Sequence, residues 1–262
     1  MAHKTKINGT SYDVQGGRCR VNGTSYEVKK GRTLINGTGY DIAFKPPKPV
    51  KGDLITMNLD GTDRLYRVLK IVNETVVEVL TMWNLSKRTA FNDNGNIYSN
   101  STLDTYLNTT WYNTLSTAAK AAIVAKNIKQ YQYTHNSSIF NETTHSSYAD
   151  YSTKSLKANV GNRYVYALDV EDIEMYFGGT GGSANKRTPG TFSSTDILQM
   201  FWNQTSSMGE YPWLLSARAS YSSRAWYVNG DDGNVYDSSI KDGSAVRAAF
   251  QIDLSKINFT TN

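Results

Sequence analysis

The sequence predicts an α+β domain preceded by a short all-β arm of hairpin repeats, and three observations lead to this class. Residues 7–42 contain one small unit three times. Residues 53–83 and 211–254 alternate apolar and polar side chains, as half-buried strands do. Between these stretches, residues 102–128 space their apolar side chains as amphipathic helices do.

The repeats are INGTSYDV at residues 7–14, VNGTSYEV at residues 21–28 and INGTGYDI at residues 35–42, each starting fourteen residues after the one before. Asn-Gly favours the tight turn of a two-residue hairpin, so each unit predicts two short strands. A lone hairpin is marginally stable. The strands can therefore form a compact meander, or wrap around two other chains as a shaft. The residues that we expect to serve assembly are Asn8, Gly9, Tyr12, Asn22, Gly23, Tyr26, Asn36, Gly37 and Tyr40.

Charge and proline content separate this arm from the rest of the chain. Residues 1–51 hold ten Lys and Arg against three Asp and Glu, a net charge of +7, so the total of +5 leaves −2 for the remainder. A basic arm favours docking on an acidic surface, although Lys and Arg also keep exposed short strands from aggregating. Three of the five prolines lie in residues 46–52. They predict a semi-rigid linker between a 1–45 arm and a 53–262 domain.

The first half of the large domain predicts strands and then two helices. Residues 53–83 form three alternating stretches separated by turn residues. Apolar residues in 102–115 fall at helical spacing, and Ser101 is placed to cap the helix. Ser116 is placed to cap a second, Ala-rich helix that we expect to continue through Ile128.

The middle of the domain is polar. Residues 129–151 predict a solvated loop, and its His135 and His145 lack the spacing of a helical metal pair. Asp169 follows a short strand and is placed to cap a helix over 170–177. Acidic residues in the first turn of that helix suit the helix dipole, so they need no catalytic explanation.

The C-terminal stretch predicts a hairpin and a closing strand. Residues 224–228 and 234–237 flank a glycine-containing turn at 229–233. In residues 246–254 the even-numbered positions are apolar and most odd-numbered ones are polar, so we expect Arg247 on the wet face of the last strand.

Three motifs in this stretch carry a resemblance. W-L-x-S-x-R at residues 213–218, A-W-x-V at 225–228 and V-R-x-A-F-x-I at 246–252 resemble the end of a domain of unknown function in the C-type-lectin-like class. That class includes the formylglycine-generating enzymes. Its members usually have W-L-R-S and V-R-P-A-F, whereas Leu215 and Ala248 stand here at the Arg and Pro places. The resemblance implies the fold, but no role for the missing Arg.

The resemblance also implies a setting. The domain is common in phages and prophages of Gram-positive bacteria, and the repeats resemble the ends of tail-associated phage proteins. The chain start shows no signal segment, and no apolar run is long enough to span a membrane. We therefore expect a virion protein that is made in the host cytoplasm and released by lysis.

The expected role is a tail-fibre or receptor-binding accessory protein, and we expect it to be a homotrimer. Residues 1–45 would bind other virion proteins, while the lectin-like domain would adhere to a glycan or protein of the host surface. An alternative is a capsid decoration or head-fibre protein with a mainly structural role. A glycan-degrading enzyme is the less favoured third possibility.

The expected ligand-binding residues combine aromatic rings, guanidinium groups and carboxylates, which suits stacking on sugars and hydrogen bonds to hydroxyls. They are Arg218, Tyr221, Arg224, Trp226, Tyr227, Asp231 and Asp232. Trp226 suits a core position equally well, and two adjacent Asp residues also suit a turn.

Catalysis is not expected. The single cysteine, Cys19, lies in the arm, whereas the formylglycine-generating enzymes need cysteine chemistry in the domain. The E-P-N and W-N-D motifs of calcium-dependent lectins do not occur in the sequence. We expect no cofactor, no metal ion, no nucleic-acid partner and no membrane insertion.

Overall fold

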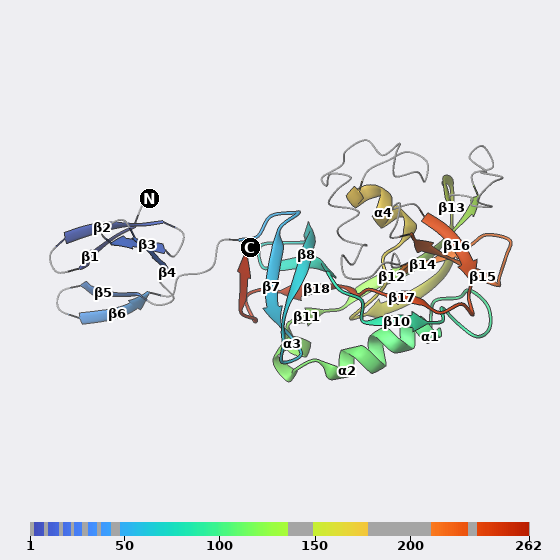
Figure 1. Ribbon diagram of the computed structural model, residues 1–262, viewed down its shortest axis with the longest axis horizontal. Coiled ribbons are helices and arrows are strands. Elements are labelled where there is room, and N and C mark those ends of the chain that lie inside the picture. The colour runs from blue at the N-terminus through green and yellow to red at the C-terminus, as the bar shows by residue number, and fades with distance from the viewer. Residues whose placement is uncertain are drawn as a thin grey trace. The chain divides into compact units, whose positions relative to one another are not determined.

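The computed structural model divides the chain into two compact units, residues 1–49 with Thr261 and residues 50–260 with Asn262 (Figure 1). The structure describes residues 48–135, 149–177, 211–229 and 235–261, and within residues 1–47 the backbone of six strands. Among these residues, no helix is both long and apolar enough to cross a membrane.

The first unit contains three hairpins, one for each repeat. Its strands are β1 (His3–Ile7), β2 (Thr10–Gln15), β3 (Arg18–Val21), β4 (Thr24–Glu27), β5 (Gly31–Ile35) and β6 (Thr38–Ile42). The closing pairs are Ile7 with Thr10, Val21 with Thr24 and Ile35 with Thr38, so each hairpin closes across one Asn-Gly pair. Strands β1 to β4 form one antiparallel sheet, and β5 pairs with β6.

The expected assembly residues divide between the strands and the turns of these hairpins. Tyr12, Tyr26 and Tyr40 lie in β2, β4 and β6. The turn residues Asn8, Gly9, Asn22, Gly23, Asn36 and Gly37 lie outside the described residues.

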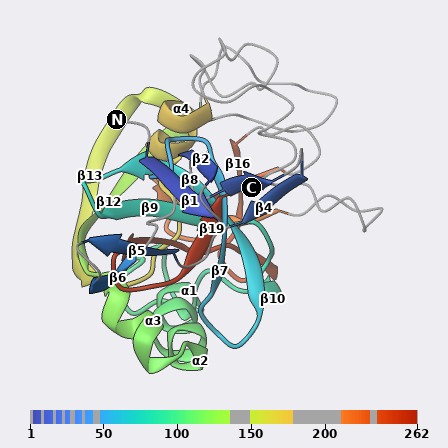
Figure 2. The same cartoon turned by 90° about the vertical axis from the view of Figure 1, so that its left-hand side faces the viewer.

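The chain is mostly β, with 50% of residues in strands, 15% in helices and one helix of 13 residues. The expected α+β class is therefore wrong. The second expected helix ends at Ala122, because Ile123 adopts an extended backbone and begins a strand. Of the expected polar loop at 129–151, residues 129–135 lie in β12 (Lys126–His135) and residues 149–151 lie in its antiparallel partner β13 (Ala149–Arg163) (Figure 2), while residues 136–148 lie outside the described residues.

Two sheets contain most of the strands described in the second unit. The first has the order β11-β18-β9-β8-β7-β19. Its strands are β7 (Leu54–Asn58), β8 (Asp63–Ile71), β9 (Val76–Thr81), β11 (Ile123–Val124), β18 (Ala249–Asp253) and β19 (Phe259–Thr261). A short pair, β10 (Ser86–Thr89) with β17 (Ser244–Val246), accompanies it.

The second sheet has the order β13-β12-β14-β15-β16. Its remaining strands are β14 (Trp213–Arg218), β15 (Arg224–Val228) and β16 (Val235–Ser239). Strands β12 and β14 run parallel, and the other neighbours run antiparallel. The predicted hairpin of residues 224–237 is thus confirmed by β15 and β16.

The helical segments begin where the sequence predicts. A continuous helix consists of α1 (Thr102–Thr105), the π-helical η1 (Tyr106–Trp111) and α2 (Tyr112–Thr114), followed by α3 (Thr117–Ala122) and later α4 (Val170–Phe177). The Ser101 hydroxyl accepts from the N–H of Asp104, and the Ser116 hydroxyl accepts from that of Ala119. Asp169 caps α4 by accepting from the N–H of Glu171 at 2.9 Å.

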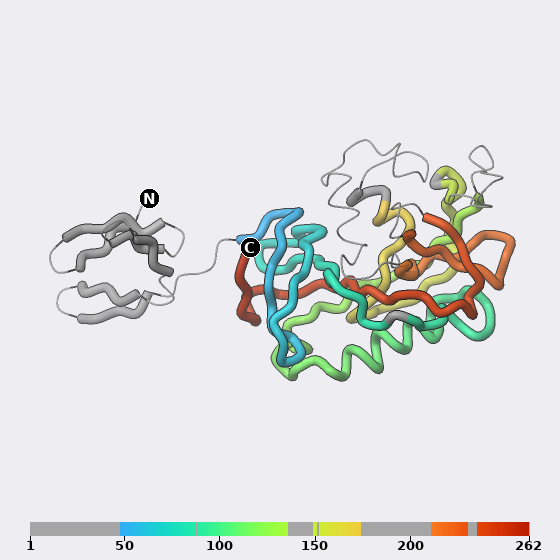
Figure 3. The backbone as a smooth tube through the Cα atoms, viewed as in Figure 1, coloured from blue at the N-terminus to red at the C-terminus, as the bar shows by residue number. Residues whose placement is uncertain are grey.

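One hydrophobic core joins both sheets and the long helix. Trp111 from the helix packs against Phe250 of β18, with ring centroids 5.9 Å apart. Figure 3 shows the backbone as a smooth tube, coloured along the chain from blue to red. Arg247, expected on the wet face, is buried, and its Nη1 donates to the carbonyl of Thr81 at 3.1 Å. That prediction is wrong because the residue lies between β17 and β18, where the period-2 alternation breaks down.

Candidate functional site

The loop of residues 218–224 joins β14 to β15 and is held by one side chain from a distant part of the sequence. The side-chain nitrogen of Asn96 lies 3.0 Å from the carbonyl oxygen of Arg218 and 2.9 Å from those of Tyr221 and Arg224. An amide nitrogen carries two hydrogens, so two of the three carbonyls share one of them. Because Asn96 is almost fully buried, these bonds fix the loop from the inside.

Gln130 of β12 holds Asn96 in place. Its side-chain nitrogen donates to the carbonyls of Asn96 at 2.7 Å and Leu215 at 2.9 Å, while its oxygen accepts from the N–H of Tyr98 at 2.9 Å. Gln130 is fully buried, and buried polar groups whose donors are all paired rigidify the part of the core around them. The 218–224 loop therefore stands on a rigid base.

Asp237 of β16 is the electrostatic centre of this site. One carboxylate oxygen lies 2.7 Å from Nε2 of His135. The other accepts from Nη1 of Arg218 at 2.8 Å and from Nε of Arg224. The Asp237 side chain is only 4% exposed, while that of Arg224 is 38% exposed, so one buried carboxylate organises cations that reach the surface.

The surroundings of Asp237 keep it ionised. Burial alone would raise the pKa of this carboxyl. The hydrogen bonds from His135 and Arg224, together with the charges of Arg218 and Arg224, outweigh burial and lower the pKa below its ordinary value. The cluster thus contains one negatively charged carboxylate and two permanently positive guanidinium groups. Because the guanidinium groups have more N–H donors than the carboxylate can accept, the cluster has an excess of hydrogen-bond donors.

Tyr221 is the exposed part of the site. Its ring is 52% exposed, and the guanidinium carbon of Arg218 lies 4.0 Å from the ring centroid. This cation–π contact orders the ring without burying it. The site therefore combines an exposed aromatic ring with guanidinium groups on a fixed loop, which suits stacking on a sugar and hydrogen bonds to its oxygens.

A second polar network lies at the start of α4. Asp169 accepts hydrogen bonds from the Tyr133 hydroxyl at 2.5 Å and the Ser216 hydroxyl at 2.8 Å. The carboxylate of Asp172 accepts from the N–H of Asp169 at 2.8 Å. Burial and the neighbouring Asp169 raise the pKa of Asp172 to about 7. Because these side chains are paired with one another and cap the helix, we interpret the network as structural.

Residues 68–254 match a family described as a domain of unknown function, DUF6273. This match covers well over half of the chain. The chain belongs to the DUF6273 family. No curated protein and no solved structure matches it, so the resemblance to the C-type-lectin-like class and to phage proteins stays a prediction.

The DUF6273 match includes every expected ligand-binding residue, but the structure gives these residues different places. It brings Arg218, Tyr221 and Arg224 together. Trp226 is fully buried, and its Nε1 donates to the carbonyl of Ala217 at 3.0 Å. The proposal of Trp226 as a ligand contact is therefore corrected: it is a core residue with no free ring face.

Of the remaining expected residues, the structure describes only Tyr227. Tyr227 packs edge-on against Tyr211 and Trp213, at centroid distances of 5.8 and 6.1 Å. Asp231 and Asp232 lie outside the described residues. Over the described parts of this DUF6273 domain, no group of three or more His, Cys, Asp or Glu is placed to hold a metal ion.

Sequence reasoning missed three residues that build the site. His135 was expected in a solvated loop, but it ends β12 and lies against Trp226, with ring centroids 5.4 Å apart. Asp237 could have been suspected, because cross-strand pairing places it opposite Trp226 in the predicted hairpin. Asn96 left no local signal, since the partners of its side chain lie more than 120 residues away.

Proposed function

We propose that this protein is an accessory protein of a bacteriophage virion, whose DUF6273 domain binds a carbohydrate on the host surface and whose arm binds the particle. The proposed binding surface is the 218–224 loop with Tyr221 at its tip. The proposed assembly is a trimer formed through residues 1–45.

The observation that carries this proposal is the exposed ring of Tyr221 on a loop that Asn96 fixes by three hydrogen bonds. A preorganised loop loses little conformational entropy on binding. Aromatic rings stack on the apolar faces of sugars, while guanidinium N–H groups donate to sugar oxygens. The Arg218 guanidinium lies over this ring, and Arg224, whose side chain is partly exposed, ends the same loop, so both interactions are available on one loop.

Two features support the virion setting. The arm consists of three hairpins with a net charge of +7 over residues 1–51, and a basic surface favours docking on an acidic assembly. Its repeats also resemble those of tail-associated phage proteins. The two-stranded pair β5–β6 needs further contacts for stability, and chains of a trimer would supply such contacts to one another.

The test is sedimentation of the full-length protein with cell envelopes from a panel of Gram-positive bacteria. Periodate oxidation of the envelopes cleaves sugar diols and serves as the matched control. We expect the protein to sediment with at least one envelope and to lose binding after oxidation. Failure to bind any envelope would refute adhesion, and binding that survives oxidation would refute a diol-bearing glycan as the receptor.

A further inference from the structure

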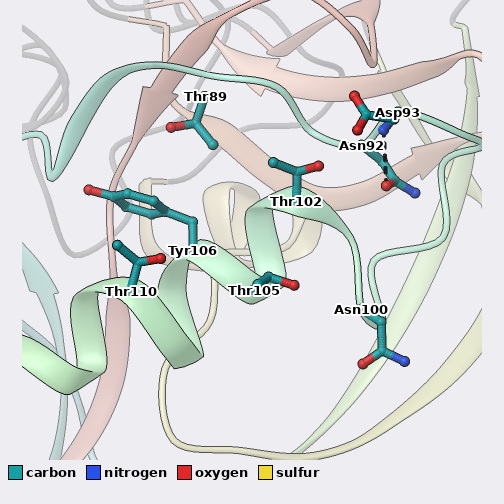
Figure 4. A pocket seen from close by; sticks show the side chains of 8 residues that line it. All are labelled: Thr89, Asn92, Asp93, Asn100, Thr102, Thr105, Tyr106 and Thr110. Carbon is teal, nitrogen blue, oxygen red and sulfur yellow. Dashed lines mark hydrogen bonds between the residues drawn. The ribbon is translucent and has the colours of Figure 1, made fainter.

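A polar groove lies between the long helix and the segment that follows β10. Its volume is about 410 Å³, which is within the range of roughly 300–1,000 Å³ that small-molecule sites occupy. The hydroxyls of Thr89, Thr102, Thr105 and Thr110 and the ring of Tyr106 contribute to its lining (Figure 4). Small-molecule sites are usually lined mainly by apolar side chains, so this lining indicates a polar ligand.

The helical side of the groove offers hydrogen-bonding groups that are not used elsewhere. Within the described parts of the chain, the hydroxyls of Thr102, Thr105 and Thr110 form no hydrogen bond, and all three residues are exposed. In contrast, the hydroxyl of Tyr106 donates to the carbonyl of Leu85 at 2.8 Å. This bond fixes the Tyr106 ring, so the groove combines a fixed aromatic surface with free hydroxyls.

Asn92 and Asp93, from the segment that follows β10, and Asn100, which directly precedes the cap of the helix, complete the lining (Figure 4). The Asn92 amide donates to the carbonyls of Asn94 and Gly95, both at 3.0 Å, which shapes the turn. Among the described residues, the carboxylate of Asp93 and the side-chain amide of Asn100 contact no hydrogen-bond partner. Asp93 is thus the only ionisable acid or base in the groove lining, apart from the bonded Tyr106.

The helix changes geometry where it borders the groove. Residues Tyr106–Trp111 are π-helical, and the N–H of Tyr112 donates to the carbonyl of Leu107, five residues back. Asn108 holds this turn, because its side chain donates to the carbonyl of Val165 at 2.8 Å and accepts from the Val165 N–H at 3.2 Å. Short π-helical segments are rare and occur frequently at functional sites. This one places Tyr106 and Thr110 in the groove wall.

We propose that this groove binds a neutral saccharide, at a site separate from Tyr221. Threonine hydroxyls and asparagine amides both donate and accept, which matches the mixed donors and acceptors of sugar hydroxyls. The Tyr106 ring supplies a surface for the apolar face of a sugar ring. The single unpaired carboxylate, Asp93, disfavours anionic sugars by charge repulsion.

The inference is tested by NMR titration of the isotope-labelled full-length protein with three probes: maltotetraose, the tetramer of N-acetylglucosamine, and glucuronate. We expect at least one of the two neutral probes to shift the amide signals of residues 89–93 and 100–110, and glucuronate to bind more weakly. The triple variant Thr102→Val, Thr105→Val, Thr110→Val removes three hydroxyls and keeps the side-chain shape. It should bind that probe roughly tenfold more weakly.

Two further variants complete the design. Thr117→Val changes an exposed threonine of α3 outside the groove and should bind as the unmodified chain does. Asp93→Asn should narrow the difference between neutral and anionic probes. The inference is overturned if neither neutral probe shifts the groove signals, if the shifts centre on residues 218–224, or if the triple variant binds equally well. Envelope binding tests the Tyr221 surface, and these titrations test the groove. Either proposal can therefore fail without the other.

Discussion

The side-chain nitrogen of Asn96 lies 2.9 Å from the carbonyl oxygen of Tyr221, 125 residues further along the chain. This contact joins the connection between β10 and the long helix to the loop between β14 and β15. The groove residues Asn92 and Asp93 belong to the same connection. One buried amide therefore shapes the Tyr221 loop, while its neighbours in the sequence line the polar groove.

Replacing Asn96 should loosen this loop and destabilise the domain. Asn96→Ala leaves the carbonyls of Arg218, Tyr221 and Arg224 without their shared donor, and buried unpaired carbonyls are costly. We expect a loss of about 2–3 kcal/mol in the free energy of unfolding, measured by urea denaturation. The exposed Asn94→Ala in the same connection is the matched control. Equal stability of the two variants would show that the Asn96 bonds contribute nothing.

Removing the charge of Asp237 should cost about 3 kcal/mol, because two guanidinium groups would lose a buried partner. Asp237→Asn keeps the side-chain shape, and the exposed Asp242→Asn serves as the control. The pKa of Asp237 is lowered in the folded protein, so its ionised form adds stability at neutral pH that is lost as the pH falls through the folded pKa. At acidic pH, the difference in the free energy of unfolding between the unmodified chain and Asp237→Asn should therefore become smaller. A difference that stays constant with pH would contradict this account.

Asp172 should make the domain less stable as the pH rises. Its pKa is raised from 3.8 to about 7, so between these values the folded chain binds more protons than the unfolded chain, and stability falls with increasing pH. Asp172→Asn mimics the protonated side chain and keeps an oxygen for the Asp169 N–H. Because Asp172 is partly exposed, we expect the variant to be more stable by only about 1 kcal/mol at pH 8 and equally stable at about pH 3.5, below both pKa values. Urea denaturation at both pH values measures the free energy of unfolding of the two chains. A difference that is the same at both pH values would rule out Asp172 as its cause.

The arm should assemble the chain into trimers. Light scattering of the full-length protein at micromolar concentration should give about three times the mass of one chain. Deleting residues 1–45 should give monomers, because the proposed contacts lie in the hairpins. A monomeric full-length chain, or a truncated chain that remains trimeric, would contradict the proposed role of the arm.

Local features of the fold could be predicted from the sequence because their causes are local. The caps Ser101, Ser116 and Asp169 bond to backbone groups two or three residues away. Each Asn-Gly pair also lies where a hairpin closes. A cap or a tight turn is set by a few neighbouring residues, so sequence patterns identify it.

The fold class and the candidate site around Asp237 depend on long-range contacts that local sequence patterns do not reveal. Strand β12 was not predicted because most of its residues are polar. Its buried residues include Gln130, a polar residue whose hydrogen-bond partners lie in distant segments of the chain. The cluster around Asp237 needs β12 to lie beside β14 in the sheet, since only that pairing brings His135 to Asp237. Tertiary pairing of this kind overrides local propensity.

The measurement that tests the central claim most directly compares two affinities for a purified bacterial envelope to which the full-length protein binds. One is the affinity of the unmodified protein, and the other is that of its Tyr221→Ala variant. Tyr164→Ala is the matched control, because Tyr164 is 46% exposed and Tyr221 is 52% exposed. If the 218–224 loop is the binding surface, Tyr221→Ala should weaken binding about tenfold or more, since it removes the stacking ring. Tyr164→Ala should bind as the unmodified chain does. Unchanged binding by Tyr221→Ala, or an equal loss in both variants, would contradict the claim.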